Sequence, residues 1–248
     1  MLKKLFSKKP ISDKEKLITE LKKDGTILEN ATSELQNSKE VVLEAVKQNG
    51  YSLKWASQPL QGDKDIVTIA LKTNCFSKKF MNEKFYADED IVSNMFICGC
   101  ESFDSVDYSM RENKKVVMIA VEKEGVSLKY VSEELRDNNE VVIQALNSSG
   151  HALEFASDRL KNDINMVKLA VNNHGAALKY AANELQDNKE IVMLAVQNKG
   201  LALKYASERL INDYEVLDIA CQSDNGKALY LANQTLRHNE ELKKYLIH

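Results

Sequence analysis

Apolar side chains recur along this chain with a fixed period of 25 residues. The clearest copy, 188–212, has its first apolar residues at Ile191, Val192, Ala195 and Val196. This is the i, i+1, i+4, i+5 spacing of a buried helical stripe. Gly200 follows, then a second apolar pattern, and the same order recurs at 163–187 and 138–162. Such self-similarity is typical of arrays of stacked repeats, so the pattern predicts an all-α solenoid.

The whole array is divided into repeats by its period. The boundaries are 13–37, 38–62, 63–87, 88–112, 113–137, 138–162, 163–187, 188–212 and 213–238, followed by a half repeat from Asn239. We expect a single array over 12–248, a right-handed solenoid of about nine antiparallel helix pairs with a polar cap at 239–248. One extra residue within 221–229 is expected to lie in a turn.

Each repeat is expected to contain two short α-helices. The first begins at an Asn or Asp three residues before a carboxylate, as at Asp187 and Glu190, which is typical of an N-cap. It ends at the glycine, for which we expect a left-handed backbone conformation. The second carries an aromatic residue and a small alanine that lets neighbouring helices approach closely. Pro59 is expected to shorten the second helix of its repeat.

The two repeats within 63–112 keep the period but depart from the pattern. Cys75 and Cys100 occupy the glycine position, and Lys78 replaces a core leucine. One interpretation is that bulkier side chains repack these repeats and bend the array. The other is a binding pocket, because aromatic and methionine clusters are common at interaction surfaces. The candidate aromatic surface consists of Phe76, Lys78, Phe80, Phe85, Tyr86, Phe103 and Tyr108.

A row of lysines precedes the aromatic residue of successive repeats. The lysine row consists of Lys54, Lys79, Lys129, Lys179 and Lys204, and Glu29, Glu154 and Tyr230 interrupt it. Stacked repeats would align these lysines, which could then bind an acidic partner. Alternatively, the row is a solvated face in which Lys129 and Lys204 pair with Glu133 and Glu208 four residues on.

Composition narrows the classes of partner. The chain has 34 Lys+Arg against 37 Asp+Glu and a formal net charge of -3, so it lacks the basic excess on which binding to a phosphate backbone depends. The basic tail at 1–11 is interpreted as a frayed end or a lid on the first helix, or alternatively as a weak membrane contact. No apolar run reaches the length needed to cross a bilayer, which favours a cytoplasmic protein, with export by a specialised machine still open.

The sequence contains no recognisable catalytic arrangement. None of the four histidines has the spacing of a metal-binding pair, and the glycines are single rather than clustered in a phosphate-binding loop. The four cysteines form no CxxC pair and provide no set of four zinc ligands. We interpret Cys75 and Cys100 as small buried substitutes for glycine in a reducing compartment. No enzyme activity, cofactor or metal is expected.

The repeat pattern resembles a known family. A carboxylate, a β-branched pair, an alanine, a glycine, and then leucine, a charged residue and an aromatic residue occur in order at 138–160 and 188–210, and at Lys114–Leu135 with Lys115 replacing the carboxylate. This order resembles the repeat of the domain-of-unknown-function 4116 family. The resemblance implies a helical repeat without an established active site, found in protists and their intracellular bacteria, where some members look like host-directed effectors.

These observations lead to two functional hypotheses. The first is a non-enzymatic scaffold that binds a protein or peptide, in keeping with a host-directed effector. The alternative is a nucleic-acid-binding solenoid that acts through the lysine row. The oligomeric state and the identity of the partner do not follow from the sequence.

Overall fold

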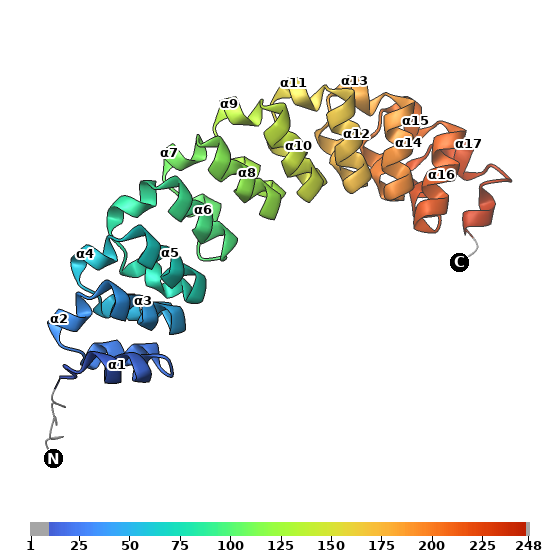
Figure 1. Cartoon of the computed structure of the whole chain (residues 1–248). Helices are drawn as coiled ribbons and strands as arrows, with labels where there is room; N and C mark the ends of the chain where they lie inside the picture. The colour runs from blue at the N-terminus through green and yellow to red at the C-terminus, as the bar shows by residue number, and fades with distance from the viewer. Residues whose placement is uncertain (1–9, 247–248) are drawn as a thin grey trace, which may run out of the picture. The chain divides into compact units, whose positions relative to one another are not determined.

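The computed structural model describes residues 10–246, which form two compact blocks (Figure 1). The first block extends to Met110 and the second begins at Arg111. The described residues of both blocks are helical, apart from turns and an isolated parallel bridge between Ile11 and Ala31. The tail predicted at 1–11 lies outside the described residues except for its last two positions.

Each repeat begins with its longest α-helix. These helices are α1 (Lys14–Leu21), α3 (Lys39–Gln48), α5 (Lys64–Thr73), α6 (Glu89–Ile97), α8 (Lys114–Lys123), α10 (Asn139–Ser148), α12 (Ile164–Asn173), α14 (Lys189–Asn198) and α16 (Tyr214–Asp224). The predicted N-cap is wrong by one residue, because Asn188 rather than Asp187 accepts from the Ile191 N–H. A side-chain oxygen at this position satisfies one of the unpaired amides of the first turn.

The second half of each repeat is not the continuous α-helix that we predicted. In most repeats it consists of a 3-10 helix, two extended residues and a single α-helical turn, whereas repeat 63–87 ends in a second 3-10 helix. The 3-10 helices are η1 (Gly25–Asn30), η2 (Gly50–Trp55), η3 (Cys75–Lys79), η4 (Glu83–Ala87), η5 (Phe103–Ser105), η6 (Gly125–Tyr130), η7 (Gly150–Phe155), η8 (Gly175–Tyr180), η9 (Gly200–Tyr205), η10 (Lys227–Leu231) and η11 (Lys243–Leu246). The single turns are α2 (Ser33–Gln36), α4 (Gln58–Gln61), α7 (Tyr108–Arg111), α9 (Glu133–Arg136), α11 (Asp158–Lys161), α13 (Asn183–Gln186), α15 (Glu208–Ile211) and α17 (Gln234–Arg237).

The first of the two extended residues between the short helices is the alanine expected inside a helix. Ala181 has φ -69° and ψ 154°, so the next amide points away from its own repeat. That amide, of Ala182, donates to the carbonyl of Lys161 in the preceding repeat at 3.0 Å. The equivalent bonds join Thr32 to Ile11, Ser57 to Gln36, Asn82 to Gln61, Ser132 to Arg111, Ser157 to Arg136 and Ser207 to Gln186. The break in the helix therefore supplies a backbone bond between repeats.

Pro59 was predicted to shorten its helix near the end, but it lies in the first turn of α4. An amide there has no partner within the helix, so proline is tolerated.

The glycine that begins each regular 3-10 helix is required for close contact between repeats, not for a left-handed turn. No glycine at this position has a positive φ. A Cβ built on Gly175 would lie 2.3 Å from the carbonyl oxygen of Ala195 in the next repeat, and one on Gly50 would lie 1.9 Å from that of Ala70. The same clash occurs at Gly25, Gly125, Gly150 and Gly200. The predicted left-handed conformation was therefore wrong at these positions.

Within each block, the long helices form one layer and the 3-10 helices another. Successive long helices pack side by side in chain order (Figure 1), as α12, α14 and α16 do. In the regular repeats a long helix also contacts its own 3-10 helix and that of the preceding repeat, as α14 contacts η9 and η8. The apolar core fills the space between the layers, where Val192, Val196 and Leu203 are fully buried.

Ion pairs join the starts of neighbouring long helices. The Lys39 ammonium lies 2.7 Å from Asp63, the N-cap of the next long helix, and 3.1 Å from Asp65. Lys64 and Lys189 repeat this arrangement, and Lys114 pairs with Glu140. Burial by itself would raise the pKa of Asp63, but the hydrogen bonds from Lys39 and from the Ile66 amide hold that pKa below its usual value. The periodic carboxylates thus link repeats rather than completing a capping box.

The last repeat differs at its turn and at its end. The extra residue lies in the turn as predicted, where Asn225 and Gly226 both adopt the left-handed conformation. The expected helix after 238 is instead a turn followed by η11. Its Leu242 is fully buried, and its Tyr245 hydroxyl donates to Asp218 at 2.9 Å. Residues 239–246 of the predicted cap therefore cover the end of the apolar core with the side chain of Leu242.

Replacing Gly175 with alanine tests the close contact. The added methyl group must push Ala195 and its helix away, so we expect the free energy of unfolding to fall by about 2 kcal/mol or more in urea denaturation. Gly62→Ala is the matched control, because its Cβ would lie no closer than 3.3 Å to any neighbour. An equal decrease in the free energy of unfolding of the two variants would show that the close contact does not exclude a Cβ at position 175.

Candidate functional site

The structure separates the candidate aromatic surface into exposed and buried members. Phe76 and Tyr108 are 63% and 64% exposed, and Tyr86 is 40% exposed. Phe85 and Phe103, by contrast, are each only 3% exposed and belong to the core. Phe80 is partly buried and makes an edge-on contact with Tyr51 of the preceding repeat. Only Phe76, Tyr86 and Tyr108 can therefore present a large area to a partner.

Lys78 does not lie free on that surface. Its ammonium donates to the Cys100 carbonyl at 2.8 Å and pairs with Glu101 at 3.0 Å. The Tyr86 hydroxyl donates in turn to the Lys78 carbonyl at 3.2 Å. A charged residue at a core position needs such partners, since an unpaired buried charge is costly. Lys78 is accordingly a link between repeats 63–87 and 88–112.

The lysine row is exposed, and each of its ammonium groups lies over an aromatic ring. Lys129, Lys179 and Lys204 lie 5.5, 5.3 and 4.8 Å from the ring centroids of Tyr130, Tyr180 and Tyr205. Lys54 lies over Trp55 and Tyr51, and Lys79 over Phe76. Such contacts are worth about 0.5–1 kcal/mol at exposed sites and hold the ammonium in place.

The alternative ion pairs predicted for this row are not formed. Lys129 and Lys204 make no salt bridge to Glu133 or Glu208 within residues 10–246. The reason is the break after the tyrosine, which interrupts the α-helix in which an i, i+4 pair would face each other. Burial, followed by the carboxylate of Glu154, which interrupts the row, raises the pKa of Tyr180 in the next repeat.

Two open grooves lie between the short helices of neighbouring repeats. One of about 360 Å³ is lined by Glu133, Arg136, Phe155, Ala156, Ser157, Asp158 and Lys161, and another of about 350 Å³ by Gln58, Gln61, Met81, Asn82 and Glu83. They occupy equivalent positions in the two blocks, so they follow from the repeat. The mixed charges of the first groove select no single class of ligand.

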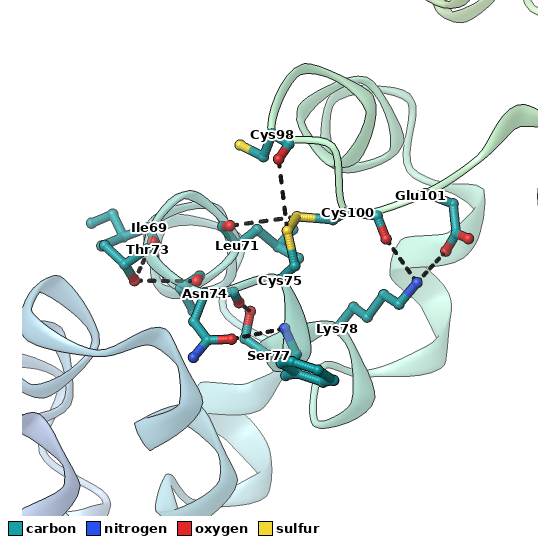
Figure 2. The surroundings of a disulfide bond; sticks show 12 residues. Ile69, Leu71, Thr73, Asn74, Cys75, Ser77, Lys78, Cys98, Cys100 and Glu101 are labelled. Atoms are coloured by element: carbon teal, nitrogen blue, oxygen red, sulfur yellow. Dashed lines mark hydrogen bonds and ion pairs between the residues drawn. A yellow bond between two sulfur atoms is a disulfide. The ribbon is translucent and has the colours of Figure 1, made fainter.

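Cys75 and Cys100 form a disulfide, which the sequence analysis did not predict (Figure 2). Their Cα atoms are 4.8 Å apart, within the range that a disulfide spans. The two residues occupy the glycine position of consecutive repeats, 25 residues apart. The spacing of the two cysteines by one full period was a signal of this disulfide in the sequence. The sequence could not show that this position is where repeats approach most closely.

The remaining titratable groups form no metal-binding cluster in the described part of the chain. No three His, Cys, Asp or Glu side chains among residues 10–246 are placed to hold a metal ion. Burial raises the pKa of the Cys221 thiol to about 12, so this thiol stays protonated near neutral pH. No helix in the same range is long and apolar enough to cross a bilayer.

His151 and His174 lie next to each other in consecutive repeats. Their rings stack across two repeats with centroids 4.1 Å apart. Burial, followed by the charges of His151 and Lys199, lowers the pKa of His174 below its usual value. Protonation of His174 is therefore disfavoured in the folded chain.

This histidine predicts a pH dependence of stability. Since the folded pKa of His174 is lowered, the unfolded chain binds more protons below about pH 6.5, and stability falls as the pH falls through that region. In His174→Asn, which carries the residue found at Asn49 and Asn74, we expect a smaller loss of thermal stability between about pH 8 and pH 5. If the variant lost as much thermal stability as the wild type between these two pH values, the histidine pair would not be the cause of the pH dependence.

Comparison with known proteins places this repeat in a family. The family model described as Domain of unknown function (DUF4116) matches residues 13–61, 39–86, 88–136, 138–186 and 188–237. Each match spans about two of the 25-residue repeats. No curated protein and no solved structure matches the chain. Because the five matches cover nearly the whole sequence, the chain belongs to the DUF4116 family.

Proposed function

We propose that this chain is a non-enzymatic scaffold that binds an extended acidic segment of a protein along the lysine row of its second block. The observation that carries the proposal is that Lys129, Lys179 and Lys204 are exposed, lie over tyrosine rings, and make no ion pair within the described residues. Other periodic charges, such as Lys189 and Asp213, are used in bonds between repeats. The lysine row is thus a set of periodic charged side chains that are not used in ion pairs between repeats.

The chemistry of the row favours a peptide over nucleic acid. Glu154 lies between Lys129 and Lys179 in the row, and the chain carries a net charge of -3. A phosphate backbone has uniform charge and would be repelled at Glu154, whereas a peptide can place a neutral or basic residue there. Ordered ammonium groups also lose less side-chain entropy on binding. The nucleic-acid alternative is kept as an outcome of the test.

We also propose a solenoid architecture and a cytoplasmic location for this protein. Contacts between successive long helices support solenoidal stacking within each block, and its right-handed sense stays a prediction. Phe76, Tyr86 and Tyr108 offer apolar area for a second contact in the first block. We place the protein in the cytoplasm and retain a host-directed effector as the biological setting, which rests on the family resemblance alone.

The test measures binding of a fluorescent glutamate-rich peptide and of an oligonucleotide of equal charge to the full chain. Exposed ion pairs contribute about 0.5 kcal/mol each, so a Lys129→Ala, Lys179→Ala, Lys204→Ala variant should bind the peptide about tenfold more weakly at low salt. The control changes Lys114, Lys168 and Lys189 to alanine, which alters the net charge equally but removes lysines that already have partners.

The outcomes separate the alternatives. Loss of peptide binding only in the row variant supports the proposal. Equal losses in both variants would mean that attraction is nonspecific, and binding of the oligonucleotide alone would favour the nucleic-acid function.

A further inference from the structure

We infer that Cys75 and Cys100 are a reversible redox site, in which Cys75 exchanges with low-molecular-weight thiols and disulfides and Cys100 is the resolving cysteine. The inference does not depend on the proposed peptide-binding function. It rests on the register of the two residues, the local backbone that brings them together, and their difference in exposure.

The register places both sulfurs at the contact between repeats. In regular repeats this position is glycine, because any Cβ would meet a backbone carbonyl of the next repeat. Cys75 carries a Cβ, and the carbonyl at the equivalent position of the next repeat, that of Met95, accepts from the Cys100 amide at 2.7 Å. The disulfide therefore joins repeats 63–87 and 88–112 at the position where regular repeats have the glycine contact.

The end of α6 brings Cys100 to Cys75. Gly99 has φ 72°, a left-handed conformation that glycine adopts without a steric cost. Its amide donates to Phe96 and the following amide donates to Met95, which is the hydrogen-bond pattern of a Schellman motif. The regular repeats lack this left-handed turn, and their chain leaves the helix in an extended conformation, as at Asn49.

The two sulfurs differ in access, and this sets the order of exchange. Cys75 is only partly buried, whereas Cys100 is 7% exposed and its sulfur lies 3.6 Å from the carbonyl oxygen of Leu71 in α5. An external thiol therefore reaches Cys75 first. Cys98 is also partly exposed, but Figure 2 shows that its carbonyl oxygen, rather than its sulfur, faces Cys75.

Oxidation proceeds by two exchange steps with a disulfide such as oxidised glutathione. The Cys75 thiolate attacks one sulfur of that disulfide, forms a mixed disulfide and expels one glutathione thiolate. The Cys100 thiolate then attacks the Cys75 sulfur, forms the Cys75–Cys100 bond and expels the second thiolate. The two cysteines lose two protons and two electrons, and the oxidant becomes two thiols. Reduction is the reverse, beginning with attack of an external thiol on Cys75.

The experiment reduces the full chain, removes the reductant and exposes the folded chain to oxidised glutathione. Free thiols are then alkylated in denaturant, and the peptides are mapped by mass spectrometry without reduction. We expect Cys75 linked to Cys100 in the wild type, with Cys98 and Cys221 alkylated. In Cys100→Ser, glutathione should remain attached to Cys75. In Cys75→Ser, its attachment to buried Cys100 should be at least about tenfold slower. Linkage of Cys75 to Cys98, or equal rates in the two variants, would overturn the assignment.

A second measurement tests whether the disulfide stabilises the fold, and it compares the oxidised and reduced wild-type protein. Reduction of the wild type should lower its thermal midpoint by about 5 °C or more, because the cross-link restricts the unfolded chain. The Cys75→Ala, Cys100→Ala double variant should show no redox dependence. A midpoint that does not respond to reduction in the wild type would contradict a stabilising link.

Discussion

The close approach of one repeat to the next, through a position that has no Cβ, is the constraint on which the rest of the structure depends. At Gly175 the chain passes so near the Ala195 carbonyl that a methyl group cannot fit. That spacing brings the extended Ala181 within reach of the preceding repeat, so the following amide can bond to the Lys161 carbonyl. A continuous α-helix would have used this amide internally. The irregular second half of the repeat is therefore a device for coupling neighbours.

The same constraint explains which polar side chains remain available. Carboxylates at the starts of the long helices are occupied by lysines of the preceding repeat, as in the pair of Lys189 and Asp213. Lysines beside the 3-10 helices have no such neighbour, because the chain turns away before a carboxylate can face them. They lie over the adjacent tyrosines instead. One face of the repeat is thus used for cohesion and another stays open to solvent.

Repeats 63–87 and 88–112 are held together without the glycine contact. Cys75 cannot make the close contact, and the cross-link to Cys100 together with the ion pair of Lys78 and Glu101 connects the two repeats by other means. Two of the aromatic residues that suggested a pocket, Phe85 and Phe103, fill the core. These two side chains pack into the core, whereas Phe76 remains exposed.

The sequence by itself determined the period, the long helices, their buried stripes and the family, because these depend on local spacing and on caps within a few residues. It placed the N-caps one residue early and treated the second half as α-helical, since a 3-10 helix and an α-helix share similar apolar spacing over six residues. Only the tertiary structure decided the role of Gly175, the pairing of Cys75 with Cys100 and the stacking of His151 on His174. Each of these is a contact between repeats, and periodicity within one repeat carries no information about which atoms meet across the boundary.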